Sequence, residues 1–321
     1  MKKVEAILFS DLHINDYPKF NSNYKRTQNH LRVLFLIKGL CKEYKCPAIF
    51  CGDLFHKPEY IEQDILDMVM STFRDLDKDD WKMYAIDGNH DCNKTNVVGK
   101  PVMGWISILS KQYKFLESIN FKNIIVGEDI AIHGVPYIDH NIGLNKYVKN
   151  LTLVGGAKNI LILHTDYPGA KDTDGVEVGS VENLNINSLS RFDLVLCGHI
   201  HKPQRLSKKV YMIGAPLQQR RTDKDCELGY WKLYSDLSME FVPFKEFPKF
   251  IDVTSEEDVK DDGNYYTVIS VNKEEEKSEN NRINKKLSQV GIVRKYLRTK
   301  GIKDPEKKEI LVNLIKEAEN D

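Results

Sequence analysis

Short apolar runs along this chain end repeatedly in clusters of polar residues. The run at 49–51 is followed by Gly52 and Asp53, and a short hydrophobic stretch bounded by glycine is typical of a buried strand. Asp53 would then stand at the carboxyl end of its strand, where open α/β sheets bind their ligands. The same pattern recurs at Asp11 and His13, at 87–91, at His164 and at 197–201. The sequence therefore predicts five strand ends that converge on one site.

Between these runs the apolar spacing changes between helical and extended periods. It predicts helices over 27–44, 59–76, 102–113 and 142–153, and strands over 4–9, 83–86, 159–164, 193–197, 210–213, 230–234 and 239–242. Residues 121–137, with a turn at 127–129, favour a hairpin. Mixed parallel and antiparallel strands indicate an α/β (α+β) fold. The Gly- and Asp-rich loop at 165–181 is long enough to border a substrate cleft.

The composition changes near residue 246, and charged residues dominate 272–286. We therefore expect a catalytic domain over 1–246, a small α+β cap over 247–285 and C-terminal helices over 286–321. Asp304 and Pro305 predict the start of the last helix, because proline is favoured in a first turn. Its apolar face could dock on a partner's coiled coil or pack on its own domain.

The amino-acid composition excludes fewer classes of function than the motifs do. Lys and Arg together number 47, as do Asp and Glu, so any nucleic-acid binding must depend on local basic patches. The six cysteines form no C-x-x-C pair, which favours a reducing cytoplasm. Glu5 and Asp11 interrupt the first apolar stretch, so we expect a strand there and no signal peptide. No run reaches the roughly 18 apolar residues of a membrane span.

The polar residues at the strand ends are oxygen and nitrogen ligands. Imidazole mixed with carboxylate suits Mn, Fe or Zn better than Mg or Ca. Two ions about 3.5 to 4 Å apart would need a bridging carboxylate, for which Asp53 is the candidate. His90, between Asn89 and Asp91, fits a histidine that assists the leaving oxygen.

Each motif also has a structural interpretation. A lone Asp-x-His is common in turns, and the His199 and His201 pair could simply be structural. Five such motifs in this order, each after a predicted strand, favour the metal site. Six further residues are assigned structural or packing roles: His30, His133, His140, Cys51, Cys92 and Cys197.

Together these motifs resemble the signature of the calcineurin-like metallophosphoesterase superfamily, in the family's order. The resemblance covers about residues 1–245 and implies a β-sandwich flanked by helices, with a dinuclear metal site. By that likeness the first metal would take Asp11, His13, Asp53 and His201, and the second would take Asp53, Asn89, His164 and His199.

Finer motifs resemble the SbcD-type nucleases of DNA double-strand-break repair and phage recombination. Gly52 to His56 carries the extra histidine of that branch, and residues 197–204 and 214–218 are similar to its extensions. The likeness implies that His90 assists the leaving group and His56 helps to position DNA. It also implies Mn²⁺ dependence, single-strand endonuclease and 3′ to 5′ double-strand exonuclease activity, homodimerisation, an SbcC-like coiled-coil ATPase partner, and a bacterial or phage-infected cell as the location. The helices predicted at 59–76 and 102–113 carry extra apolar residues, which could form the dimer seam or ordinary core.

The chain departs from that branch in its short region beyond residue 246, which implies a reduced DNA-capping domain. Lys202, Arg205, Arg220 and Arg221 are candidates for contacts to backbone phosphates, against the alternative of a solvated basic face. Two rival functions stay open. One is a phosphatase or nucleotide phosphodiesterase on the same fold, and the other is a scaffold without catalytic activity.

Overall fold

The computed structural model describes residues 2–92, 104–138, 143–178, 184 and 186–269. Two six-stranded sheets form the larger of two compact units, which comprises 1–251 and 262–265. In spatial order the first sheet contains β14 (Met239–Pro243), β13 (Gly229–Tyr234), β1 (Val4–Phe9), β2 (Ala48–Phe50), β3 (Met83–Ala85) and β4 (Leu116–Ser118). The second contains β11 (Gln204–Arg205), β12 (Val210–Met212), β10 (Leu194–Gly198), β7 (Lys158–His164), β6 (Ile130–Val135) and β5 (Asn123–Val126).

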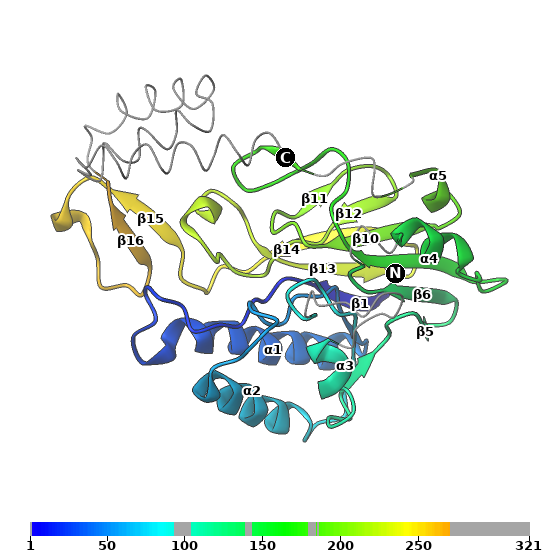
Figure 1. The fold of residues 1–321 in the computed structure, drawn as a ribbon, viewed down its shortest axis with the longest axis horizontal. Helices are drawn as coiled ribbons and strands as arrows, with labels where there is room; N and C mark the ends of the chain where they lie inside the picture. Colours follow the sequence, from blue (N-terminus) through cyan, green and yellow to red (C-terminus); the bar gives the residue numbers. More distant parts are fainter. Residues whose placement is uncertain (1, 93–103, 139–142, 179–183, 185, 270–321) are drawn as a thin grey trace, which may run out of the picture. The chain divides into compact units, whose positions relative to one another are not determined.

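Helices cover the outer face of each sheet (Figure 1). The first sheet packs against α1 (Lys25–Tyr44), α2 (Gln63–Leu76) and α3 (Trp105–Leu109), and the second against α4 (Leu144–Asn150) and α5 (Ile186–Leu189). Short 3-10 turns lie at η1 (Ser22–Tyr24), η3 (Arg221–Asp223) and η4 (Glu256–Asp258). The predicted β-sandwich flanked by helices is confirmed.

Both faces of the central strands are buried, which explains their continuous apolar runs. In β1, Ile7 and Phe9 face the helices, whereas Ala6 and Leu8 face the second sheet. Burial on two sides fixes the strand rigidly, so the residue after it has a fixed position. A polar group placed there is held by the core.

Strand direction explains why the polar ends meet. β1, β2 and β3 are parallel neighbours in the first sheet, and β7 and β10 are parallel neighbours in the second. Parallel strands bring their carboxyl ends to the same edge of a sheet. The hairpin predicted at 121–137 forms as β5 and β6, which are antiparallel.

The helices differ from the predicted ranges mainly at their starts. α2 begins at Gln63 rather than 59, after a turn in which Lys57 pairs with Glu62 at 3.2 Å. α3 begins at Trp105, because the buried Asp87 carboxylate accepts hydrogen bonds from the Ile106 N–H and the Ser107 hydroxyl. The helix ends at Leu109 and the short strand β4, which the sequence pattern did not indicate, pairs with β3.

Two small sheets complete the described chain, β8 (Ala170–Lys171) with β9 (Glu177–Val178), and β15 (Phe250–Val253) with β16 (Tyr265–Val268). The second compact unit contains 252–261 and the residues from 266 onward. The predicted boundaries at 246 and 285 stay predictions, and the helices predicted over 286–321 lie outside the described residues. Every helix in the described part of the chain is too short or too polar to cross a membrane.

Candidate metal centre

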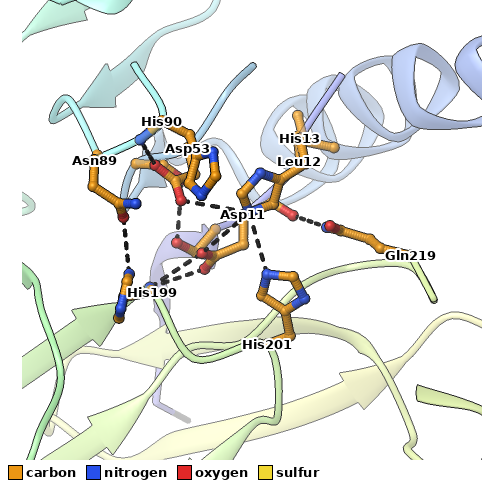
Figure 2. A network of polar contacts seen from close by, with 12 residues as sticks. Asp11, Leu12, His13, Asp53, Asn89, His90, His199, His201 and Gln219 are labelled. Carbon is orange, nitrogen blue, oxygen red and sulfur yellow. Dashed lines mark hydrogen bonds and ion pairs between the residues drawn. The ribbon is translucent and has the colours of Figure 1, made fainter. Parts of the chain in front are cut away.

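Side chains that follow β1, β2, β3 and β10 meet at one edge of the sandwich (Figure 2), and His164 at the end of β7 contacts Asp53 and Asn89 there. Asp11 and His13 follow β1, Asp53 follows β2, and Asn89 follows β3. His164 ends β7, and His199 and His201 follow β10. All seven predicted metal ligands therefore lie together, although residues 11 and 201 are far apart in the sequence.

The donor atoms form two groups with Asp53 between them. The first donor group contains Asp11, His13 and His201, and the second contains Asp53, His164 and His199. Within each group the ligand atoms lie within 4.8 Å of one another. Asp53 Oδ2 lies 3.4 Å from His13 Nε2 and 3.2 Å from His164 Nε2. One carboxylate oxygen thus faces both groups.

Asn89 completes the second group. Its Oδ1 lies 3.0 Å from His164 Nε2 and 2.8 Å from His199 Nδ1. His164 Nδ1 lies 2.7 Å from the Cys51 carbonyl oxygen, which can only accept, so Nδ1 carries a proton and Nε2 is the ring atom that faces the group.

The electrostatics of this cluster favour a bound cation. Burial opposes a charge on His164, yet the Asp53 carboxylate raises the pKa of His164 to about 9. Burial likewise opposes ionisation of Asp53, but attraction to His164 and His13 holds the pKa of its carboxyl below the usual range. Burial keeps the pKa of His13 low, so its ring is neutral. The positive charge that Asp53 favours on His164 marks a place where a cation would be stabilised, and imidazole nitrogens, an amide oxygen and carboxylates together fit a divalent transition metal.

The backbone at these positions is strained. Asp11, His13, Asp53 and His199 all have positive φ angles, of 53°, 47°, 63° and 91°. Residues other than glycine rarely adopt positive φ angles, and residues whose backbone is strained in this way cluster at functional sites. Gly88 is required for a different reason, because a Cβ there would collide with the Asp53 carboxylate.

The buried Asp91 carboxylate holds two of the ligand loops together. It accepts hydrogen bonds from the backbone N–H groups of Asp53 at 2.8 Å, Leu54 at 2.9 Å and Phe55 at 3.3 Å. It also accepts one from Gly88 N at 2.9 Å. The loops after β2 and β3 are thereby tied to each other.

We expect Asp91→Ala to lower the free energy of unfolding by roughly 3 to 5 kcal/mol, because it leaves several buried N–H groups unpaired. Urea unfolding of the metal-free protein measures this loss. Asp75→Ala is the matched control, since that carboxylate on α2 is exposed. A loss below about 1 kcal/mol would contradict the role of Asp91.

The sequence of this chain matches a known protein family over most of the two sheets. The sequence profile of the calcineurin-like phosphoesterases matches residues 6–203. The chain belongs to this family. A relative is "Putative phosphoesterase 244L" of Invertebrate iridescent virus 6, 26% identical over 180 residues, which are 53% of this chain and 58% of that protein. The D component of the SbcCD nuclease of Staphylococcus epidermidis is 32% identical over 95 residues, or 27% of this chain and 25% of that one.

The chain thus spans little more than half, or a quarter, of the length of these curated relatives. Solved structures are more distant. The Thermus thermophilus protein TT1561 is 14% identical, with a TM-score of 0.47, over 75% of this chain and 99% of that one. The Pseudomonas putida nuclease MPE is 17% identical, with a TM-score of 0.29, over 64% of this chain and 66% of that one.

His90 and His56 lie beside the donor groups. The His90 N–H donates to Asp53 Oδ1 at 2.8 Å, and its ring Nδ1 donates to the His56 carbonyl oxygen at 2.5 Å. The two rings stack with centroids 5.3 Å apart. His56 Nδ1 also lies 3.4 Å from His13 Nδ1, and these three histidines form a further possible metal-binding cluster. The ring of His90 is therefore fixed through Nδ1, which leaves Nε2 for another partner.

Asp166 contacts the second donor group, and no motif in the sequence had indicated it. Its Oδ1 lies 3.1 Å from His199 Nε2. Such a contact places the proton on Nε2 and turns the Nδ1 lone pair toward Asn89. A carboxylate two residues after His164 was the available signal, but loops contain many acidic residues.

The four predicted DNA-binding residues lie on segments that follow the ligands. Lys202 comes directly after His201, and Arg205 ends β11, with its guanidinium 5.6 Å from the Tyr211 ring centroid. Arg220 Nε pairs with Asp223 Oδ1 at 3.4 Å, and Arg221 begins η3. Lys171, in the loop at 165–178, exchanges backbone hydrogen bonds with the Gln204 side chain, so this loop borders the same segment.

The described residues assigned to packing contribute no side chain to either donor group. His133 Nε2 lies 2.8 Å from Asn159 Oδ1, and Cys51 and Cys197 are buried. Cys92 is half-buried, and His140 lies outside the described residues. His30 is buried under the loop after β1, where its Nδ1 lies 2.7 Å from the Leu12 carbonyl oxygen.

His30 gives a testable pH dependence. Burial lowers its pKa to about 3, below the 6.5 of an exposed histidine. The unfolded chain therefore binds a proton that the folded chain does not, so stability falls as the pH drops from 6.5 toward 3. At about pH 5 this loss is on the order of 2 kcal/mol. His30→Gln should flatten the fall in unfolding free energy between about pH 7 and pH 5, and an unchanged slope would contradict the assignment.

Proposed function

We propose that this chain is a Mn²⁺-dependent DNA nuclease, with single-strand endonuclease and 3′ to 5′ double-strand exonuclease activity. The observation that carries phosphoester hydrolysis is the position of Asp53 Oδ2 between two groups of nitrogen and oxygen donors. A non-catalytic scaffold has no need of strained ligand positions in two sheets. Family membership supports a metal-dependent hydrolase.

Two divalent ions would be held by the chain's own donors. In this proposal Asp11, His13, His201 and Asp53 hold one ion. Asp53, Asn89, His164 and His199 hold the other. When bound, such ions neutralise charge on a phosphate and lower the pKa of water at the site.

His90 is proposed to assist the leaving oxygen. Since its Nδ1–H is held by the His56 carbonyl, its Nε2 is the atom that can donate a proton or a hydrogen bond to substrate. The His56 ring stacks on His90 and restricts its rotation. We propose that the exposed edge of His56 also contacts the substrate.

Support for DNA as substrate comes from the basic residues near the ligands. Lys202, Arg205, Arg220 and Arg221 would bind backbone phosphates, which contributes a salt-dependent affinity without sequence preference. The partial likeness to one component of an SbcCD nuclease agrees with DNA. We further propose a homodimer with a coiled-coil ATPase partner, as in an SbcCD-like recombination or repair complex.

The test uses purified protein with Mn²⁺, Mg²⁺ or EDTA and three substrates, namely circular single-stranded DNA, a linear duplex labelled at one 3′ end, and nucleoside 2′,3′-cyclic phosphates. We expect Mn²⁺-dependent cleavage of both DNAs, and Asp53→Asn purified in parallel controls for contaminating nucleases. The alternative is a metal-dependent phosphatase or nucleotide phosphodiesterase. Hydrolysis of nucleotides without cleavage of either DNA would establish that alternative.

A further inference from the structure

The loop after β1 is held by hydrogen bonds to five successive backbone carbonyls. Each carbonyl from Asp11 to Asn15 accepts from a different residue. The donors are Gln219 Nε2 to Asp11, His30 Nδ1 to Leu12 at 2.7 Å, Tyr17 Oη to His13 at 2.7 Å, His56 N to Ile14 at 3.2 Å and Thr27 Oγ1 to Asn15 at 2.8 Å. Figure 2 shows Gln219 reaching toward this loop. Asp11 and His13, both with positive φ, are thus fixed through their own backbone.

Arg26 lies behind two of these donors. Its side chain, only 4% exposed, places the guanidinium carbon 3.8 Å from the centroid of the Tyr17 ring. The same guanidinium donates a hydrogen bond to the Gln219 carbonyl oxygen. Arg26 therefore contacts both Tyr17 and Gln219, which in turn hold His13 and Asp11.

The surroundings of Arg26 are unusual for a buried cation. Among the described residues no carboxylate forms an ion pair with it, and its Nε has no hydrogen-bond partner. Its other neighbours include the rings of Phe250 and Tyr265, at 5.3 and 5.4 Å. Burying a guanidinium without a carboxylate costs free energy that cation–π contacts only partly offset. If Arg26 served only to fill space in the core, a neutral apolar side chain would cost less free energy to bury. The charged group therefore indicates a role beyond packing.

We propose that Arg26 is a positioning residue for the first donor group. It fixes the Tyr17 ring and the Gln219 backbone. The side chains of these two residues donate to the carbonyl oxygens of His13 and Asp11, and so hold both residues in their strained backbone conformation. Two members of the second donor group are held by other contacts, because the Asp53 N–H donates to Asp91 and His164 Nδ1 donates to the Cys51 carbonyl. In the described part of the chain the third, His199, is linked to the first group only by its backbone N–H, which donates to the Asp11 carboxylate at 3.1 Å. Loss of Arg26 should therefore weaken one metal position and spare the other. The inference rests on the proposed metal function of the site.

The test measures Mn²⁺ binding directly, by isothermal titration of the full chain. We expect two ions for wild type. For Arg26→Met, which keeps the apolar bulk, we expect affinity at one position to fall about 10- to 100-fold, as for other residues that orient ligands. The other position should keep its wild-type affinity. Tyr17→Phe keeps the ring and loses the bond to His13, so it should weaken the same position to a smaller extent.

Arg32→Met is the matched control. Arg32 lies on the same helix and also contacts an aromatic ring, that of Phe247 at 5.2 Å, but it is exposed and remote from the ligand loop. It should bind both ions as wild type does. Urea unfolding of each metal-free variant separates positioning from general destabilisation.

Three outcomes would overturn the inference. The first is wild-type Mn²⁺ affinity at both positions in Arg26→Met, and the second is an equal loss of affinity at both positions in that variant. The third is a loss of affinity in Arg32→Met as large as the loss in Arg26→Met. Failure of wild type to bind Mn²⁺ would overturn both this inference and the proposed function. Binding of two ions without cleavage of DNA would overturn only the proposed substrate.

Discussion

Asp53→Asn should abolish hydrolysis, with a loss on the order of 10³-fold or more. The substitution keeps the side-chain volume and one carbonyl oxygen but removes the charge shared by both donor groups. Loss of a single electrostatic contact at an active site commonly costs about 10²- to 10³-fold, and Asp53 would serve two ions at once. The rate of Mn²⁺-dependent DNA cleavage, with protein purity checked by mass spectrometry, measures the effect.

The same variant should lose stabilisation by metal. For wild type, Mn²⁺ at about 100 times its dissociation constant should raise the free energy of unfolding by about 2.7 kcal/mol for each ion. Asp53→Asn should gain far less. Asp79→Asn, which alters a half-buried carboxylate paired with Lys38 and Lys42, is the control and should respond as wild type does. Full metal stabilisation of Asp53→Asn would exclude Asp53 as the shared ligand.

His90→Ala should slow DNA cleavage by about 10²- to 10⁴-fold while both ions stay bound. That range is typical for removal of a general acid or base. His90 contributes only its backbone N–H to Asp53, and alanine keeps that group. Activity and Mn²⁺ stoichiometry, measured on the same preparation, test both halves of the expectation.

A leaving group that needs no proton separates this role from a structural one. With bis(p-nitrophenyl) phosphate, whose phenolate leaves unaided, the effect of His90→Ala should shrink to less than about tenfold. Equal losses on DNA and on this substrate would mean that His90 orients the substrate or supports the site instead. Loss of bound metal in His90→Ala would make it a ligand.

The convergence of these side chains was predictable because each motif carries two local signals. An apolar run marks the strand, and the polar residue at its end marks where the strand stops, as at Asp53 and His164. Burial of the strand on both faces then leaves little freedom in where that residue stands. The likeness to a known family added the assignment of ligands to each ion, which the spacing alone left open.

The supporting residues could not be predicted, because their roles depend on contacts between distant segments. Arg26 and Gln219 are 193 residues apart, and neither lies in a pattern that indicates the other. Asp166 was one acidic residue among several in a loop. The predicted start of α2 was too early and the predicted α3 was too long, because both ranges were taken from apolar spacing. Apolar spacing carries no information on polar side chains such as Asp87 that cap a turn.

Each donor group draws residues from both sheets, and this affects the kinetics of folding. His13 follows a strand of the first sheet and His201 one of the second, so neither group exists until the sandwich has closed. Contacts that form after the transition state change the unfolding rate and leave the folding rate nearly unchanged. Bound Mn²⁺ should thus stabilise the native state only after the transition state for folding. In chevron plots the unfolding rates should fall, and the refolding rates should stay unaltered.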